Sequence, residues 1–402
     1  MGDLNIIHKV ILSLYVLAGG AVSCATAVFL TRVVKDFAVR RNLMDAGGGR
    51  KVHTTPTPRL GGVAIFGGFS VGLGFLWVVA QFVPALADLV RFPHPAVMTG
   101  ALIMCAYGLV DDLMGLKPWE KLVGQSLMAV VVILGGYRFS VGSYTLNNLG
   151  IEPDLVLIPL TFVWILGVVN AINLIDGMDG LATGVAFMVV GSLTAAMALA
   201  GGQVGFAFEA AFLGALIGFL IFNFHPAKIF MGDSGSLFIG FILATYALPV
   251  TTKAATVYGF LIPVAALGLP LLDTTMAFVR RIMKGTSPFM ADKDHIHHRI
   301  SLMLGLCHRD TVFALYGVTM VFGVTAVALA TGQVLVAVAS VAVALIVVGI
   351  MLNKLGYLQP RRLLFRSFVS LLSSFERFHV GNASEEHAVP LAPKNTSNLL
   401  LR

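Results

Sequence analysis

Long apolar stretches, separated by short polar ones, run through most of this chain and constrain its fold more than any other feature. A helix needs about 20 apolar residues to cross a bilayer. Of the 402 residues, 57% are hydrophobic and only 12% are charged, whereas a soluble chain carries about 25% charged residues. So few charges cannot cover a water-facing surface of this size. The chain is therefore predicted to be an all-α, polytopic integral membrane protein.

The length of the apolar stretches predicts about eleven transmembrane helices. They lie near residues 6–33, 61–85, 95–111, 121–137, 154–171, 181–200, 204–222, 236–250, 255–278, 311–330 and 333–352. The first stretch is too long for the apolar core of a signal peptide and lacks a clear cleavage site, so we interpret it as an uncleaved membrane helix.

The distribution of Lys and Arg predicts the orientation. With the N-terminus outside and the C-terminus in the cytoplasm, 23 of the 27 basic residues fall in the inside segments, a strong bias under the positive-inside rule. The same bias accounts for the net charge of +7, so no nucleic-acid partner is predicted. The three cysteines are far apart and show no CxxC spacing, which indicates neither a disulfide framework nor a zinc cluster. We expect a multi-pass protein of the cytoplasmic (inner) membrane.

Five polar segments all fall at predicted inside ends of the spans. They are "GGGRKVHTTPTPRLGG", "VDDLMGLKPWEK", "NAINLIDGMDG", "NFHPAKIFMGDSGS" and "ADKDHIHHRI". The outside connections hold no dense cluster of titratable groups. We therefore predict a transmembrane catalytic domain over residues 1–352 and a basic cytoplasmic tail over 353–402. The predicted active-site loops are 35–60, 111–121, 172–181, 223–236 and 279–310.

Five carboxylates stand in these segments: Asp111, Asp112, Asp176, Asp179 and Asp233. Acidic residues at the membrane are costly and indicate function. One of them alone could be a helix cap, but five, each with a glycine nearby, indicate a site. Mg²⁺ takes oxygen ligands, usually one or two carboxylates plus substrate phosphates. The turn "MGDSGS" is a candidate metal turn, because its glycines let the backbone bend closely.

Basic residues accompany the acids: Lys51, Arg59, Lys117, Lys121 and Lys228. Each could be a plain positive-inside anchor. Their alternation with carboxylates is what a metal–diphosphate site requires, because charge that develops on phosphoryl oxygens needs cations on several sides.

The string "HIHH" offers three imidazoles, His295, His297 and His298. Zinc binding is one interpretation, but no CxxC accompanies the histidines to complete a site. Hydrogen bonds from the imidazoles to phosphate or to substrate hydroxyls are the favoured interpretation.

Together the five segments, over residues 47 to 300 and in this order, resemble the polyprenyl-phosphate N-acetylhexosamine-1-phosphate transferase superfamily, a glycosyltransferase family 4-like group that includes the peptidoglycan-precursor translocase. Such enzymes move a sugar 1-phosphate from a UDP-sugar to a polyprenyl phosphate, such as undecaprenyl phosphate, and release UMP. The resemblance implies Mg²⁺ or Mn²⁺ as cofactor and an active site that faces the cytoplasm.

The resemblance also implies roles for single residues. Asp111 resembles a base or an orienting group for the lipid phosphate, Asn223 and Phe230 resemble contacts to uridine, and Asn173 and Asp176 resemble positions that hold the nucleotide and diphosphate. The implied catalytic residues are Asp111, Asp112, Asp176, Asp179, His297 and His298; the implied metal ligands are Asp233 and Asp112. The implied substrate-binding residues are Lys51, His53, Arg59, Lys117, Lys121, Asn170, Asn173, Asn223, Lys228, Phe230 and His295.

The loop "RKVHTTPTPRLGG" and the spacing of "HIHH" resemble the N-acetylglucosamine branch of the superfamily. UDP-N-acetylglucosamine is the favoured donor, with another UDP-N-acetylhexosamine or UDP-N-acetylmuramoyl-pentapeptide as alternatives.

A secondary transporter is the rival class, but transporters place polar groups near the bilayer midplane. Here the acids of the polar segments gather at one face. The exception is Asp273, which lies within the ninth predicted span near its inner end, as a packing residue or as part of the lipid-phosphate entrance. The oligomeric state is open, with a homodimer as one alternative. The tail is either a basic amphipathic helix on the membrane surface or, after about residue 380, a disordered end.

Overall fold

A helix lies over each of the eleven predicted spans. The structure, a computed structural model, describes residues 6–45, 56–83, 86, 92–140, 143–200, 206–248, 258–283, 285 and 296–355. Its helices are α1 (Ile6–Arg40), α2 (Gly61–Phe82), α4 (Pro95–Met114), α5 (Pro118–Leu134), α6 (Ser143–Asn148), α7 (Pro153–Ile175), α8 (Leu181–Leu199), α9 (Ala207–Asn223), α10 (Gly232–Ala247), α11 (Tyr258–Ala266), α12 (Gly268–Met283), α13 (Ile296–Leu304), α14 (His308–Ala330) and α15 (Val334–Lys354). Two short strands, β1 (Met44–Asp45) and β2 (Thr57–Pro58), pair antiparallel.

Seven of the described helices are long and apolar enough to cross a membrane: α1, α2, α4, α7, α8, α14 and α15. Helices α11 and α12 qualify only as a pair, and α9 is apolar but shorter. The chain is thus an all-α, polytopic membrane protein, as predicted. The count of eleven spans and the orientation of the termini stay predictions.

The ninth predicted span is not one straight helix. Helices α11 and α12 meet at a bend of 79°. Pro270 explains the break, because its ring would clash with the carbonyl of Ala266 if the helix continued. Proline is tolerated in the first turn of a new helix, where Pro270 lies. The prediction of one continuous helix over residues 255–278 was therefore wrong.

Helix α10 is the central element. It contacts α2, α4, α7 and α8, and most of its side chains are buried. Glycines allow the two closest approaches to its first turn. A Cβ on Gly62 of α2 would overlap the backbone of Gly235, and a Cβ on Gly108 of α4 would overlap the carbonyl of Asp233. Small residues at such contacts let helix backbones pack tightly within a membrane.

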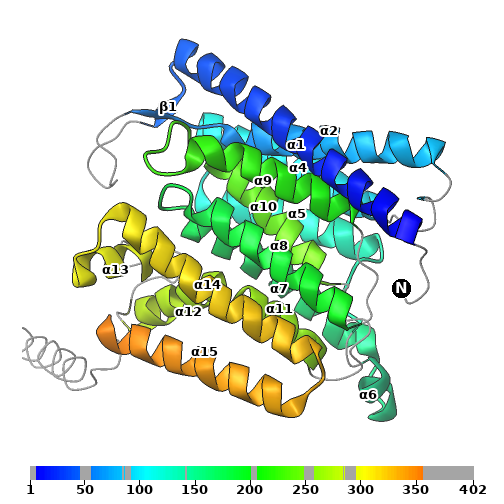
Figure 1. Cartoon of the computed structure of the whole chain (residues 1–402). Coiled ribbons are helices and arrows are strands. Elements are labelled where there is room, and N and C mark those ends of the chain that lie inside the picture. The colour runs from blue at the N-terminus through cyan, green and yellow to red at the C-terminus, as the bar shows by residue number, and fades with distance from the viewer. Residues whose placement is uncertain are drawn as a thin grey trace, which may run out of the picture. The chain divides into compact units, whose positions relative to one another are not determined.

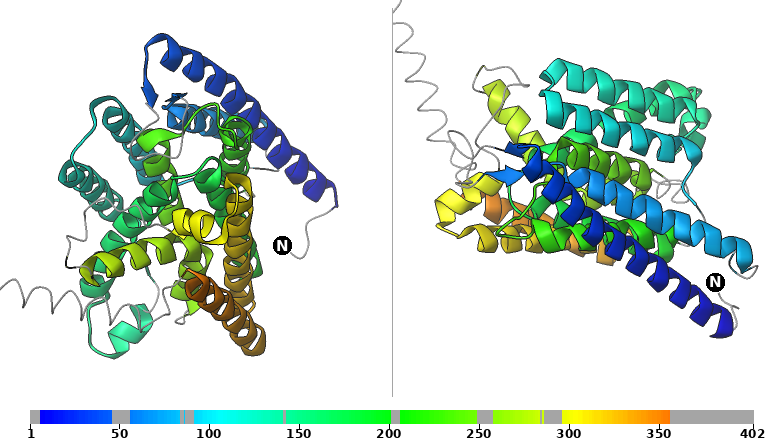
Figure 2. Two further views of the ribbon diagram at one scale, coloured as in Figure 1. Left: turned by 90° about the vertical axis from the view of Figure 1, so that its left-hand side faces the viewer. Right: turned by 90° about the horizontal axis from the view of Figure 1, so that it is seen from above.

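The chain divides into two units, residues 1–347 and 348–402. The site described below lies in the first unit. The predicted boundary at residue 352 stays a prediction, and the tail beyond residue 355 lies outside the described residues. Within the first unit, β1 and α13 lie toward one end of the helices and α6 toward the other (Figure 1). The view from above likewise shows the blue strand β1 and the yellow helix α13 at the same end (Figure 2, right).

Candidate functional site

Four helix ends meet at the first turn of α10. Asp111 lies in the last turn of α4, Lys121 in the first turns of α5, and Asn173 in the last turn of α7. All three side chains converge on Asp233, the second residue of α10. Side chains from three separate parts of the sequence, near residues 111–121, 173 and 233, are therefore brought together. We call Asp111, Lys121, Asn173 and Asp233 the Asp233 cluster.

The Asp233 cluster is an ion-paired network. The Lys121 ammonium lies 2.5 Å from Asp111 Oδ2 and 2.9 Å from Asp233 Oδ2. The Asn173 amide donates to Asp233 Oδ1 at 2.5 Å and to Ser236 Oγ at 2.8 Å. One cation thus stands between two carboxylates. Burial alone would raise the pKa of Asp233, but the Lys121 ammonium and these hydrogen bonds hold it below its ordinary value.

Asp112, the neighbour of Asp111, has a different environment. Its Oδ1 accepts the backbone N–H of Asp233 at 2.8 Å, and its Oδ2 accepts that of Ser234 at 3.0 Å. The first N–H groups of a helix have no partner within the helix, and a carboxylate there is favoured. Asp112 therefore caps α10 from another helix. Its predicted role as a metal ligand stays a prediction.

Asp176 lies just beyond the last residue of α7, at the helix C-cap, and is partly buried. Burial, followed by the carboxylates of Asp233, Asp112 and Asp179, raises its pKa well above the ordinary value. Concentrated negative charge of this kind is a feature of sites that bind cations. The structure thus places Asp176 near the predicted acids of three different segments.

Asn170 lies one turn before Asn173 on α7. Its amide donates to Gln125 Oε1 at 2.6 Å and to the Leu166 carbonyl at 2.8 Å. Gln125 is one turn after Lys121 on α5, and only 1% of it is exposed. The pair joins α5 to α7 beneath the Asp233 cluster. Asn170 was predicted to bind substrate, and the structure shows it in a contact between helices.

The described end of the predicted "GGGRKVHTTPTPRLGG" loop lies beside the segment that enters α10. The N–H of Phe230 donates to the Pro58 carbonyl at 2.8 Å, and the N–H of Gly61 donates to the Phe230 carbonyl at 3.0 Å. Strand β2 is therefore held next to the segment that enters α10. Phe230 and Arg59 are partly buried here, whereas Lys228 is exposed. Lys51 and His53, within this loop, lie outside the described residues.

Lys117 is exposed and precedes α5. Its backbone N–H donates to Glu120 Oε2 at 2.7 Å, which is half of a capping box. The structure thus places Lys117 at the N-terminus of the helix that carries Lys121. Its predicted contact with substrate stays a prediction.

A second cluster forms around Asp179, in the turn between α7 and α8. Asp179 Oδ2 lies 2.8 Å from His225 Nδ1 and accepts the backbone N–H of Ala227 at 3.0 Å. The backbone N–H of Asp179 donates to Nε2 of His308 at 3.0 Å. The two imidazole rings stack with centroids 4.3 Å apart. We call Asp179, His225 and His308 the Asp179 cluster.

The donor set of the Asp179 cluster could in principle hold a metal ion, because its three ligand atoms lie within 4.8 Å of one another. The hydrogen bonds indicate another use. The lone pair of His308 Nε2 accepts a backbone N–H, and Asp179 Oδ2 already receives two donors. A metal bound through Asp179 Oδ2 and His308 Nε2 would displace these bonds. As described, the cluster is a set of hydrogen bonds that connects three segments.

Asn223 connects two of the same segments by hydrogen bonds. Its Oδ1 accepts the N–H of Gly180 at 3.2 Å and the hydroxyl of Thr183 at 3.0 Å, while its Nδ2 donates to the Ile229 carbonyl at 3.1 Å. The predicted contact of Asn223 with uridine stays a prediction.

His225 and His308 are not among the residues predicted from the sequence to form the site. His225 lies within the quoted "NFHPAK" string and could have been found there. His308, in "CHRD", belongs to no motif, and only the fold brings it near Asp179.

Helix α13 carries His297 and His298 in its first turn. The positions of their side chains, and the whole of His295, lie outside what the structure describes. Asp273, the exception within a predicted span, accepts the backbone N–H of Ile296 at 2.8 Å.

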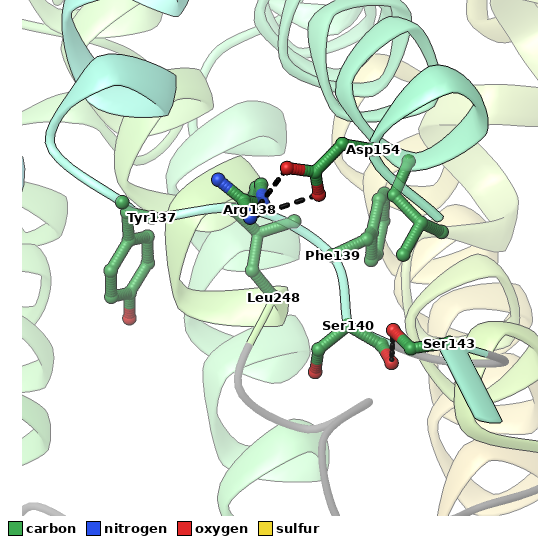
Figure 3. A pocket seen from close by; sticks show the side chains of 9 residues that line it. Tyr137, Arg138, Phe139, Ser140, Ser143, Asp154 and Leu248 are labelled. Carbon is green, nitrogen blue, oxygen red and sulfur yellow. Dashed lines mark hydrogen bonds and ion pairs between the residues drawn. The ribbon is translucent and has the colours of Figure 1, made fainter. Parts of the chain in front are cut away.

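A cavity of about 510 Å³ lies at the ends of α5, α7 and α10 that are far from the Asp233 cluster (Figure 3). Arg138 and Asp154 line it and form an ion pair with an N–O distance of 2.9 Å. None of the predicted site residues lines it. The polar clusters and this cavity are therefore at different ends of the same helices.

Comparison with known proteins identifies the family. Residues 94–251 match glycosyl transferase family 4. The chain is 37% identical over 310 residues to a Bacillus subtilis protein named probable undecaprenyl-phosphate N-acetylglucosaminyl 1-phosphate transferase. The aligned residues make up 77% of this chain and 83% of the relative. The chain belongs to glycosyl transferase family 4.

Other relatives of this family 4 enzyme have related names. A decaprenyl-phosphate N-acetylglucosaminephosphotransferase of Mycobacterium tuberculosis is 36% identical over 326 residues, covering 74% of this chain and 78% of the relative. A phospho-N-acetylmuramoyl-pentapeptide-transferase of Heliobacterium modesticaldum is 33% identical over 245 residues. The aligned residues make up 57% of this chain and 74% of the relative. The family 4 chain is thus a membrane-embedded phosphotransferase, as predicted, and the transporter interpretation is set aside.

Proposed function

We propose that this family 4 enzyme transfers N-acetylglucosamine 1-phosphate from UDP-N-acetylglucosamine to undecaprenyl phosphate and releases UMP. The product, a lipid-diphosphate-sugar, would initiate a cell-surface polysaccharide. The observation that carries the proposal is the Asp233 cluster, where two carboxylates converge on one cation at the shared end of four helices. A diphosphate and a divalent metal need this arrangement of opposite charges.

The donor atoms of the Asp233 cluster fit Mg²⁺ or Mn²⁺. Asp111 Oδ2 and Asp233 Oδ2 already share one positive charge, that of Lys121, and oxygen donors suit a hard divalent ion. Asp233 would hold the metal, with Asp111 beside it. When bound, the metal would neutralise charge on the diphosphate as UMP leaves.

The chain's own residues would arrange two phosphates for an in-line displacement. An oxygen of the lipid phosphate attacks the β-phosphorus of the UDP-sugar, and the bond from that phosphorus to the UMP oxygen breaks. A lipid phosphate is largely ionised at neutral pH, so Asp111 can act by orienting it. Lys121, in contact with both Asp111 and Asp233, would stabilise negative charge on the transferred group.

The nucleotide would lie on the side of the Asp179 cluster. Phe230 lies between β2 and α10 and is partly buried, and its ring is proposed to stack on uracil. Asn223 and Asp179 brace the two adjoining turns. His297 and His298, from α13, are proposed to contact the phosphate or the sugar.

Two relatives support N-acetylglucosamine over N-acetylmuramoyl-pentapeptide. The undecaprenyl- and decaprenyl-phosphate N-acetylglucosamine transferases match 77% and 74% of this chain, whereas the pentapeptide transferase matches 57%. The bias of Lys and Arg toward the predicted inside segments supports a reaction at the cytoplasmic face.

A radiolabel assay tests the proposal. Purified protein receives undecaprenyl phosphate and Mg²⁺ with either UDP-N-acetylglucosamine or UDP-N-acetylmuramoyl-pentapeptide, each labelled in the sugar. We expect label in the lipid only with the first donor. Label with only the second would contradict the proposed substrate, and label with neither, even when other UDP-N-acetylhexosamines are offered, would contradict the proposed reaction.

A further inference from the structure

Helix α13 is only nine residues long, and an isolated helix of that length is not stable in water. Tertiary contacts must fix its position. Ile296 and Ile300 lie one turn apart on its buried side, with 1% and 4% of their surface exposed, and the helix contacts α14. Apolar contacts of this kind are non-directional, so they hold the helix against its neighbour without fixing where its first turn begins.

A directional contact comes from α12. Asp273 is buried, with 2% of its surface exposed, and its Oδ1 accepts the backbone N–H of Ile296 at 2.8 Å. Ile296 is the first residue of α13, and its N–H has no acceptor within the helix. Asp273 therefore defines where α13 begins, from a position 23 residues earlier in the chain.

The same arrangement occurs at α10. There Asp112 of α4 accepts the first N–H groups of the helix that carries Asp233. In both cases a buried carboxylate from a neighbouring helix caps a helix whose first turn bears predicted site residues. This recurrence favours a role in positioning for Asp273 over a role as general packing.

We propose that Asp273 is a positioning residue for the transfer reaction. It fixes the start of α13 and thereby the turn that bears His297 and His298. The inference rests on the proposed function, in which those histidines contact phosphate or sugar. Misplacement of a catalytic group by about 1 Å can lower the rate about 10²-fold. Loss of the Asp273 hydrogen bond should therefore slow the transfer, although Asp273 is not proposed to contact substrate.

Two variants of the same residue separate positioning from direct catalysis. Asp273→Ala removes the acceptor, and turnover should fall about 10²-fold. Asp273→Asn keeps an oxygen at Oδ1, and Asn caps helices about as well as Asp, so its turnover should stay within about threefold of the parent. The matched control is Glu209→Gln. Glu209 is a buried acid of α9 that accepts a hydrogen bond from the Tyr246 hydroxyl at 2.6 Å. Turnover of this variant should be unchanged. Equal losses in the Ala and Asn variants would contradict the proposal.

Two further readouts keep the test independent of the proposed function. Hydrogen exchange at the amides of residues 296–299 should be faster in Asp273→Ala than in Asp273→Asn. Equal exchange in the two variants would contradict the claim that Asp273 fixes the start of α13. In a His297→Ala, His298→Ala background, Asp273→Ala should cause little further loss of turnover, whereas a full additional loss would show that Asp273 acts elsewhere. If the histidine variants alone keep full turnover, the role of the histidines in the proposed function fails, and the exchange result still decides whether Asp273 anchors α13.

Discussion

The Asp233 and Asp179 clusters both contain a buried or partly buried carboxylate, but they satisfy it differently. In the Asp233 cluster, two carboxylates share the ammonium of Lys121. In the Asp179 cluster, one carboxylate receives a backbone N–H and an imidazole, and a second imidazole accepts a backbone N–H.

The difference indicates a division of roles. A carboxylate pair held together by a side-chain ammonium can accept a metal in its place, and the ammonium can then bind phosphate, with no backbone hydrogen bond lost. A carboxylate that receives backbone donors cannot give them up without leaving buried N–H groups unpaired, which costs about 1–3 kcal/mol each. We therefore propose that the chemistry takes place at the Asp233 cluster and that the Asp179 cluster has a structural role.

The largest expected effect is at Asp233. Asp233→Asn should lower turnover by about 10³-fold, because the proposed metal loses its charged ligand. The measurement is the radiolabel assay on protein shown to be folded by its elution and melting temperature. The matched control is Asp154→Asn, which removes a carboxylate at the far end of α7, in the ion pair with Arg138, and should keep its activity. Normal turnover in Asp233→Asn would overturn the assignment of the metal site.

Lys121 should give the next largest effect. Lys121→Met removes the cation shared by Asp111 and Asp233, and turnover should fall about 10²-fold. The apparent affinity for Mn²⁺ should rise, because the metal no longer competes with the ammonium for the same oxygens. A parallel loss of turnover and of Mn²⁺ affinity would mean that Lys121 helps to build the metal site and would contradict its role toward phosphate.

The smallest expected effect is at His308. His308→Ala removes the acceptor of the Asp179 N–H and the stacking partner of His225, so the free energy of unfolding should fall by about 1–3 kcal/mol. The KM for the UDP-sugar should rise about tenfold, because a turn next to the proposed nucleotide site loosens, while Mn²⁺ affinity stays unchanged. A loss of Mn²⁺ affinity would assign the metal to the Asp179 cluster.

Much of the architecture was predictable, because lipid exposure selects long apolar helices whose length and composition are visible in the sequence. The meeting of Asp111, Asn173 and Asp233 followed from the same pattern, since segments at one end of a bundle must lie near one another. The lysine between Asp111 and Asp233 was predicted as a substrate ligand, but its pairing with both acids depends on the packing of α5 against α7 and could not be foreseen.

Capping across helices was also beyond sequence reasoning. Asp112 and Asp111 are adjacent and chemically identical, yet one caps α10 and the other binds Lys121. Which carboxylate faces which partner depends on the rotation of α4 against α10, set by the close approach at Gly108. His308 likewise has no local signal, because its partner lies 129 residues away.

A Mn²⁺ titration followed by electron paramagnetic resonance tests the division of roles most directly. The proteins compared are the parent, Asp233→Asn and the double variant His225→Ala, His308→Ala. We predict that Asp233→Asn loses Mn²⁺ binding, whereas the double variant binds Mn²⁺ like the parent. Loss of binding in the double variant, with binding retained in Asp233→Asn, would place the metal at the Asp179 cluster and contradict the account.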